Sequence, residues 1–384
     1  MYRFFITLIG CFISGCVTTV VPTGSADRIF HDDLFEAAST PVHAEDALTV
    51  SDAMRHYAQD QLLHSMDGVN RNDVRTLFVR KTYQKGELKL DYDASQTRTA
   101  AQAFESKSGN CLSLVLLTSA MAKEIGLSVQ YQSVVVKPDW NRKNNFFVSI
   151  DHVNLVISDP LARVISWPRE ITIDFLPSEV AQAMETTTID EKTVLAMYSN
   201  NRAIESLMDG KINDSYWWAR ESLRQDSNFP NAYITLGVIF REISRADLSE
   251  QVLSQLADLA PDNTAMLANR ILVLRELGKI QEAEKLADRL ARLDPHPPMS
   301  YFKQAQKEMV EGHFEIAKRL FEKEIERDPD RQEYEFGLAL AYFKLRDNVH
   351  AYQHMYRAFE LSTNLPVHDL YKAKLEKLKS LGVQ

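Results

Sequence analysis

The sequence predicts an α+β domain followed by an all-α solenoid of repeated helix pairs. Small residues recur every 34 positions through the C-terminal half, which is a period of stacked helix-turn-helix units. In the N-terminal half, an apolar helical segment that begins at a cysteine precedes several strand-like segments. These segments are rich in β-branched and aromatic residues, which favour strands.

The bulk composition is that of a folded protein with more than one domain. The chain has 384 residues, of which 45% are hydrophobic and 25% charged, and this length exceeds that of one ordinary core. Its formal net charge is −9. Because a nucleic acid requires a basic surface, the charge argues against nucleic acid as a partner.

Residues 1–15 have the pattern of a targeting segment. Arg3 precedes an apolar run, Phe4 to Ile13, which is too short to span a membrane as a stable helix. The run ends in Ile13-Ser14-Gly15-Cys16, which resembles the lipobox of bacterial lipoproteins. The resemblance implies removal of residues 1–15, lipidation of Cys16 and, since valine follows, an outer-membrane location facing the periplasm. A plain secretory signal and a short membrane anchor are the alternatives.

The cysteines leave one thiol available for chemistry. Residues 16–45 are expected to form the lipidated cysteine and a tether, because they are rich in Thr, Val, Ser, Pro and Ala. Cys11 lies in the signal and Cys16 is the lipid acceptor, so Cys111 remains. A lone thiol in an exported protein is a candidate nucleophile, and a buried structural cysteine is the alternative.

Residues 46–190 are expected to form the α+β domain. Helices are predicted from about Ser51, over 72–83, over 99–104 and over 112–125. The last of these ends at Gly126, a residue suited to the left-handed position after a helix. The expected strands cover 127–136, 146–157, 163–167 and 171–175.

A 34-residue period organises residues 196–363. Five small residues are spaced by 34: Ser215, Ser249, Ala283, Ala317 and Ala351. Twelve positions after each stand Ser227, Pro261, Pro295, Pro329 and Thr363, and proline ends a helix because it lacks an N–H. The pattern resembles five tetratricopeptide repeats, whose paired helices cross at small residues and whose neighbours stack. Residues 364–384 are expected to form a capping helix.

Cys111 has the surroundings of a nucleophile. It begins a predicted helix, where free N–H groups and the helix dipole stabilise a thiolate and an oxyanion. His152 is the one histidine between Cys111 and the first repeat, and it lies in a predicted strand. Asp174 and Asp159 are candidate acids to orient it. If the two strands pair, Asp174 lies across from His152.

This order of residues resembles the transglutaminase-like domains of the papain-like superfamily. The resemblance covers about residues 90–180 and is carried by Gly109-Asn110-Cys111, an apolar helix, then Gly126-Leu127 and a strand. It implies that Cys111 is the nucleophile, His152 the general base and acid, and Asp174 the orienting acid. The chain departs from the family at Asn110 and Val153, where acidic and aromatic residues are frequent. Gln102 is a candidate source of a second oxyanion donor.

Two hypotheses of function follow. In the first, a membrane-anchored cysteine peptidase, amidase or acyltransferase acts on peptide or amide bonds, and the repeats recruit a protein or peptide partner in their groove. In the second, the chain is a non-catalytic scaffold lipoprotein of an envelope complex. No cofactor or metal is expected, because the sequence contains no zinc-ligand spacing, phosphate-binding glycine loop or dinucleotide fingerprint.

Overall fold

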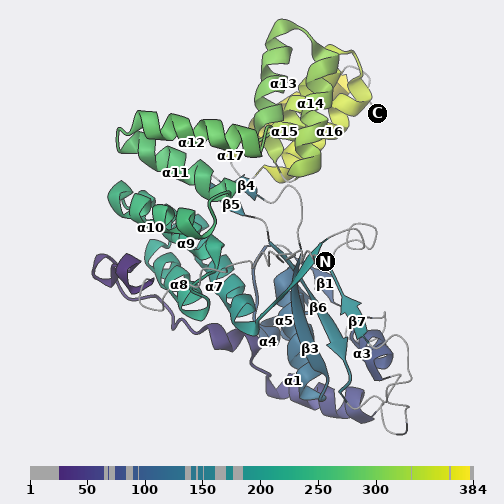
Figure 1. Ribbon diagram of the computed structural model, residues 1–384. Helices are drawn as coiled ribbons and strands as arrows, with labels where there is room; N and C mark the ends of the chain where they lie inside the picture. Colours follow the sequence, from purple (N-terminus) through teal and green to yellow (C-terminus); the bar gives the residue numbers. More distant parts are fainter. Residues whose placement is uncertain are drawn as a thin grey trace, which may run out of the picture.

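The computed structural model of the chain describes residues 26–64, 68, 74–83, 90–93, 95–134, 140–143, 146–149, 151–160, 170–175, 185–329, 331–362 and 365–380. The targeting segment, Cys16, the expected strand at 163–167 and Thr363 lie outside this part. An α+β region leads into a helical solenoid (Figure 1). No helix among the described residues has both the length and the apolar character needed to cross a membrane.

The helices of the α+β region follow the sequence pattern closely. They are α1 (Asp52–Tyr57), which continues as a π-helical turn (Ala58–Leu63), then α3 (Val74–Tyr83), α4 (Ala100–Ser106) and α5 (Cys111–Glu124). Ser51 caps α1 by accepting a hydrogen bond from the Met54 N–H, as a side-chain oxygen does at a helix start. Gly126 adopts a left-handed φ of 80° after α5, which confirms its predicted role as the helix stop.

A four-stranded antiparallel sheet packs on α5. Its strand order is β7 (Glu170–Ile173), β6 (His152–Ser158), β3 (Ser128–Val134) and β8 (Thr186–Ile189). The predicted single strand 146–157 is wrong. β5 (Phe146–Ser149) pairs with β4 (Trp140–Lys143) in a separate hairpin, whereas β6 pairs with β3 and β7. A further short pair joins β1 (Asp91–Tyr92) to β2 (Ser108–Gly109) in parallel.

The described part of the expected tether is packed against the first repeat. It contains three short 3-10 turns: Ala26–Ile29, Asp32–Leu34 and Ala44–Leu48. The Phe35 ring stacks on Tyr216 with centroids 3.8 Å apart, and the Ser39 N–H donates to Asp214 at 2.6 Å. Because these apolar and polar groups find partners on the repeat, residues 28–45 are not the free tether that the composition predicts.

Five helix pairs form the solenoid. They are α7 (Glu191–Met208) with α8 (Ile212–Gln225), α9 (Pro230–Glu242) with α10 (Ala246–Leu259), α11 (Thr264–Glu276) with α12 (Ile280–Leu293), α13 (Ser300–Glu311) with α14 (Phe314–Arg327), and α15 (Gln332–Lys344) with α16 (Asn348–Leu361); α17 (Leu365–Ser380) follows. The five small residues spaced by 34 are all fully buried, at 0% exposure. Ser249 Oγ even donates to the Gly237 carbonyl of the paired helix at 2.6 Å. The close crossing is therefore what selects small side chains.

A second 34-residue period lies in the turn inside each pair. Residues with φ between 61° and 85° occur at Gly210, Ser244, Gly278, Gly312 and Arg346. Each turn thus needs one left-handed residue, which glycine adopts without steric cost. Ser244 and Arg346 accept this conformation at some cost in free energy.

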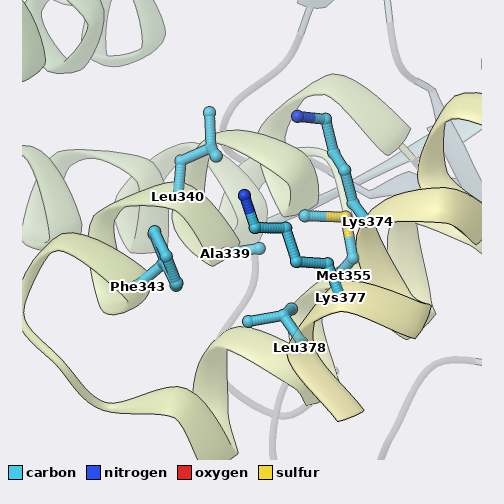
Figure 2. A pocket seen from close by; sticks show the side chains of 7 residues that line it. All are labelled: Ala339, Leu340, Phe343, Met355, Lys374, Lys377 and Leu378. Atoms are coloured by element: carbon cyan, nitrogen blue, oxygen red, sulfur yellow. The ribbon is translucent and has the colours of Figure 1, made fainter. Parts of the chain in front are cut away.

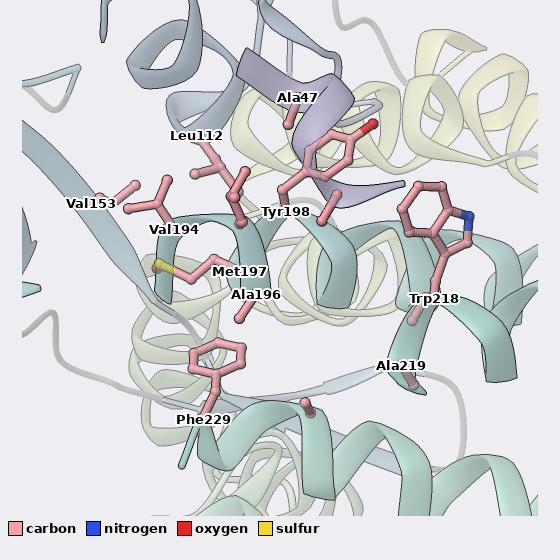
Figure 3. Packing of buried hydrophobic residues seen from close by; sticks show 14 of the residues in the cluster. Ala47, Leu112, Val153, Val194, Ala196, Met197, Tyr198, Trp218, Ala219 and Phe229 are labelled. Carbon is pink, nitrogen blue, oxygen red and sulfur yellow. The ribbon is translucent and has the colours of Figure 1, made fainter. Parts of the chain in front are cut away.

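One hydrophobic core joins the α+β region to the first three repeats. It contains Leu112 of α5, Val153 of β6 and Val194 of α7, and it continues to Leu290 of α12. Figure 3 shows Leu112, Val153 and Val194 gathered around α7 together with Met197 and Tyr198. The first repeat helix is therefore also a core helix of the α+β region.

The solenoid is interrupted between the third and fourth repeats. The segment 294–299 contains Pro295, Pro297 and Pro298, and Met299 has a φ of 67°. The buried cluster of α13 and α14, which begins at Ala305, is separate from the core that ends in α12. Helices α13 to α17 accordingly form a second body at one end of the molecule (Figure 1).

Candidate functional site

The structure brings His152 and Asp174 into direct contact. His152 Nε2 lies 2.7 Å from Asp174 Oδ1, and His152 is only 4% exposed. The pairing of β6 with β7 places Leu155 opposite Ile173. Asp174, the residue after β7, therefore lies opposite Asn154. Antiparallel pairing of β6 and β7 thus places the Asp174 carboxylate beside His152, as the sequence predicts.

Asn154 is a residue of this site that the sequence did not reveal. Its Nδ2 donates to Asp174 Oδ2 at 2.9 Å. Because Asn154 stands two residues after His152 on one strand, both side chains project from the same face of the sheet. The two carboxylate oxygens of Asp174 are therefore held separately, one by the histidine and one by the amide.

The alternative acid, Asp159, lies at the other end of the histidine strand. β6 runs from His152 to Ser158, and Asp159 follows its last residue. A strand advances about 3.3 Å per residue, so the length of β6 separates Asp159 from the imidazole. Asp174, and not Asp159, is the carboxylate in contact with the His152 ring.

Cys111 stands at the first position of α5, with partial solvent exposure. The side chain of Asn110 caps the helix by accepting from the Ser113 N–H at 2.9 Å. The N–H groups of Cys111 and Leu112 have no acceptor within the helix, because the first turn of any helix leaves its donors unpaired. These donors can stabilise negative charge on the sulfur or on an oxyanion beside it.

Charge and hydrogen bonding tune His152. Its pKa is raised from 6.5 to about 9: burial, the largest single influence, lowers it, but hydrogen bonds to Asp174 and Cys111 and the charges of both groups outweigh that effect. Because Nε2 is bound to Asp174, the other ring nitrogen, Nδ1, is the one left for the thiol. Asp174 and Cys111 thus both raise the pKa of the imidazole, and Asp174 also holds it through Nε2.

Gln102 and Phe175 contact elements next to the site. Gln102 Oε1 accepts from the Thr99 N–H in a capping box at the start of α4. The Phe175 ring meets the Tyr83 ring of α3 edge-on, with centroids 5.8 Å apart. This contact fixes the end of β7 from which Asp174 projects.

Two surface features lie on the second helical body and away from this site. Glu308, Glu311 and His313 could together contact a cation at the α13–α14 turn. A pocket of about 110 Å³ lies between α15, α16 and α17 (Figure 2). Its apolar lining includes Leu340, Phe343 and Leu378, and Lys374 and Lys377 stand beside it. Neither feature involves Cys111, His152 or Asp174.

Comparison with known proteins supports the repeats. Residues 234–298 and 302–363 match a family model of the tetratricopeptide repeat. The C-terminal region carries tetratricopeptide repeats. Repeats of this type indicate a role in protein–protein interaction. The break between the two matched stretches, residues 299–301, directly follows the proline-rich segment and includes the start of α13.

The similar solved structures have low sequence identity to this chain. One is MamA from Desulfovibrio magneticus RS-1, with 17% identity, a TM-score of 0.26, and coverage of 45% of this chain and 96% of that one. Another is YrrB, described as a TPR protein with an unusual peptide-binding site, with 16% identity, a TM-score of 0.26, and coverage of 46% and 92%. Yeast Tom70 has 16% identity, a TM-score of 0.35, and coverage of 49% and 40%. The curated proteins give no match.

Proposed function

We propose that this protein is a transglutaminase-like cysteine enzyme that acts on peptide or amide carbonyls. The observation that carries the proposal is the imidazole of His152, which hydrogen-bonds Asp174 through Nε2 at 2.7 Å and interacts with Cys111. A nucleophile, a base and a group that orients the base form the minimum set for covalent catalysis by a thiol.

The chemistry follows from this arrangement. Cys111 Sγ, its proton transferred to His152, attacks the carbonyl carbon, and the resulting oxyanion is stabilised by N–H groups at the start of α5. His152 then protonates the departing amine as the C–N bond breaks, which leaves a thioester on Cys111. Attack by water gives a peptidase or amidase, and attack by an amine gives an acyltransferase.

Acylation by p-nitrophenyl acetate tests this proposal without knowledge of the natural substrate. The protein from residue 16 onward, with Cys16→Ser, should release p-nitrophenolate in a burst and gain one acetyl group on Cys111. His152→Ala should slow this step by about 10²- to 10⁴-fold, the usual contribution of a general base. Equal acetylation of the parent protein and the His152→Ala variant would refute a working thiol–imidazole pair.

The N-terminal sequence supports a membrane anchor as part of the same proposal. The motif Ile13-Ser14-Gly15-Cys16 would place a lipidated Cys16 at the start of the mature chain, sorted to the outer membrane and facing the periplasm. Several acyl chains hold a soluble domain at a bilayer, because each buried methylene contributes about 0.8 kcal/mol. Cys16→Ser should release the protein from the membrane fraction of a bacterial host. Retention of the variant there would contradict the anchor.

The alternative function is a non-catalytic scaffold, and the repeats favour it. In both readings a protein or peptide partner binds the repeats, and the fourth and fifth repeats are the proposed place, since they form a separate body. If Cys111 fails to acylate while the repeats still retain a partner, the scaffold is the better description.

A further inference from the structure

The inner face of the first three repeats is occupied by a segment of this same chain. Helices α7, α9 and α11 are the first helices of their pairs, and the β4–β5 hairpin of the α+β region packs on them. Phe146 and Val148 of β5 are buried against Val238 of α9, with Ile204 and Leu207 of α7 beside them. In Figure 1, β4 and β5 lie beside α11, apart from the four-stranded sheet.

Asn269 of α11 binds the backbone of this hairpin through both ends of its amide. The Phe147 N–H donates to Asn269 Oδ1 at 3.0 Å, and Asn269 Nδ2 donates to the Phe147 carbonyl at 2.7 Å. Asn269 is 2% exposed. A buried amide that binds both backbone groups of one residue fixes the path of an extended strand, and its loss would remove both of these hydrogen bonds.

A second asparagine reaches the residue next to His152. Asn231, in the first turn of α9, donates from Nδ2 to the carboxylate of Asp151. The start of a helix also favours a carboxylate because the helix dipole is positive there. Since Asp151 directly precedes His152 in the chain, α9 holds the backbone from which the imidazole projects.

The cysteine side of the site has an equivalent link to the repeats. Asn110, which caps α5, donates to Thr97 Oγ1 at 2.8 Å. The Thr97 N–H in turn donates to Glu205 Oε1 of α7 at 2.7 Å. Both arms of the site, the histidine strand and the cysteine helix, are therefore connected to repeat helices by buried or half-buried hydrogen bonds.

We propose that Asn231 and Asn269 are positioning residues for His152, so that the first three repeats complete the site instead of recruiting a partner in their groove. The ligand of that groove is the chain's own β4–β5 hairpin, and the hairpin sets where β6 begins. This inference rests on the proposed thiol–imidazole function. It also implies that any external partner binds the repeats beyond α12.

The test compares the rate of Cys111 alkylation by iodoacetamide at pH 6 and pH 9. The protein from residue 16 onward, with Cys16→Ser, has Cys111 as its only thiol. Asn269→Ala and Asn231→Ala should each lower the rate at pH 6 by about tenfold relative to the rate at pH 9, because a displaced imidazolium no longer stabilises the thiolate. Asn263→Ala is the matched control: Asn263 caps the same α11 helix by accepting from the Met266 N–H at 2.8 Å and should leave the pH profile unchanged.

Hydrogen exchange at the Phe147 amide separates local release from unfolding. In Asn269→Ala this amide should exchange faster while amides of α5 and β6 stay protected. If the hairpin is released in this way and the pH 6 to pH 9 ratio stays at the parent value, the positioning role is wrong. If Asn269→Ala loses hydrogen-exchange protection throughout the chain, the measurement is made on Asn269→Asp instead, which keeps the acceptor for the Phe147 N–H. His152→Ala is the reference variant. If it leaves the ratio of the alkylation rates at pH 6 and pH 9 unchanged, the proposed function itself is refuted. If it changes this ratio and the asparagine variants do not, only the inference is refuted.

Discussion

Asp174→Asn keeps the size of the side chain but removes the charge that faces His152. In the parent protein one carboxylate oxygen binds His152 Nε2 at 2.7 Å and the other accepts from Asn154 Nδ2 at 2.9 Å. The new amide has one oxygen; when that oxygen keeps the hydrogen bond from Asn154 Nδ2, its NH₂ group faces Nε2. His152 must then accept at Nε2 and carry its proton on Nδ1, the nitrogen that should take the proton of Cys111.

The size of the effect follows from the bond that is lost. A hydrogen bond to a charged group contributes about 1.5–3 kcal/mol, and 1.4 kcal/mol corresponds to a factor of ten. The proton affinity of His152 should therefore fall by about ten- to a hundredfold. An NMR titration of the imidazole signals measures this directly, and the alkylation rate of Cys111 at pH 6 should fall in parallel.

Asp159→Asn is the control, because that carboxylate lies beyond the opposite end of β6. It should leave the titration of His152 and the alkylation profile at the parent values. The reasoning is refuted if Asp174→Asn titrates like the parent protein, or if Asp159→Asn and Asp174→Asn shift the imidazole equally.

Three further predictions concern stability. The pKa of His152 is raised from 6.5 to about 9 in the folded protein, so the protonated ring stabilises the fold. This contribution is up to about 3.5 kcal/mol, at roughly 1.4 kcal/mol per pKa unit; it is complete below pH 6.5 and is lost as the pH rises through 9. Urea denaturation at pH 6 and pH 9.5 should show the loss, and a His152→Gln variant with the same pH dependence would contradict it. Arg346→Gly should raise the free energy of unfolding by about 0.5–1 kcal/mol, because Arg346 has a φ of 65° that glycine adopts freely; thermal denaturation measures it, and Arg346→Ala should give no gain. Ala317→Leu should lower the free energy of unfolding by about 1–3 kcal/mol, because Ala317 is fully buried at a helix crossing. The surface change Arg319→Leu should alter it by no more than about 0.5 kcal/mol. Equal denaturation midpoints for the two variants would show that the crossing has room for leucine.

Features set by local or periodic patterns were predictable from the sequence. The repeat boundaries follow from Ser215, Ala283 and their equivalents, because each contact at a helix crossing recurs with the chain's own period. The start of α5 follows from Asn110 and its stop from Gly126, since capping involves only neighbouring residues. The contact between His152 and Asp174 followed from strand order once antiparallel pairing was assumed.

Features set by tertiary contact were not predictable. Residues 146–157 form an uninterrupted strand-like pattern, and only the packing of Phe146 on the repeats divides it into two strands. The composition of residues 16–45 is that of a tether, yet Phe35 finds an aromatic partner in Tyr216. Asn231 and Asn154 have no sequence signature, because their roles depend on residues 80 and 20 positions away.

The most direct test of the central claim is the alkylation of Cys111 at pH 6 in the parent protein and in His152→Ala. If His152 holds the thiol as an ion pair, the parent protein should react at pH 6 nearly as fast as at pH 9. The His152→Ala variant should instead lose reactivity steeply as the pH falls, since only the thiolate reacts. A parent protein that loses reactivity just as steeply, or is inert at both pH values, would contradict a working Cys111–His152–Asp174 site.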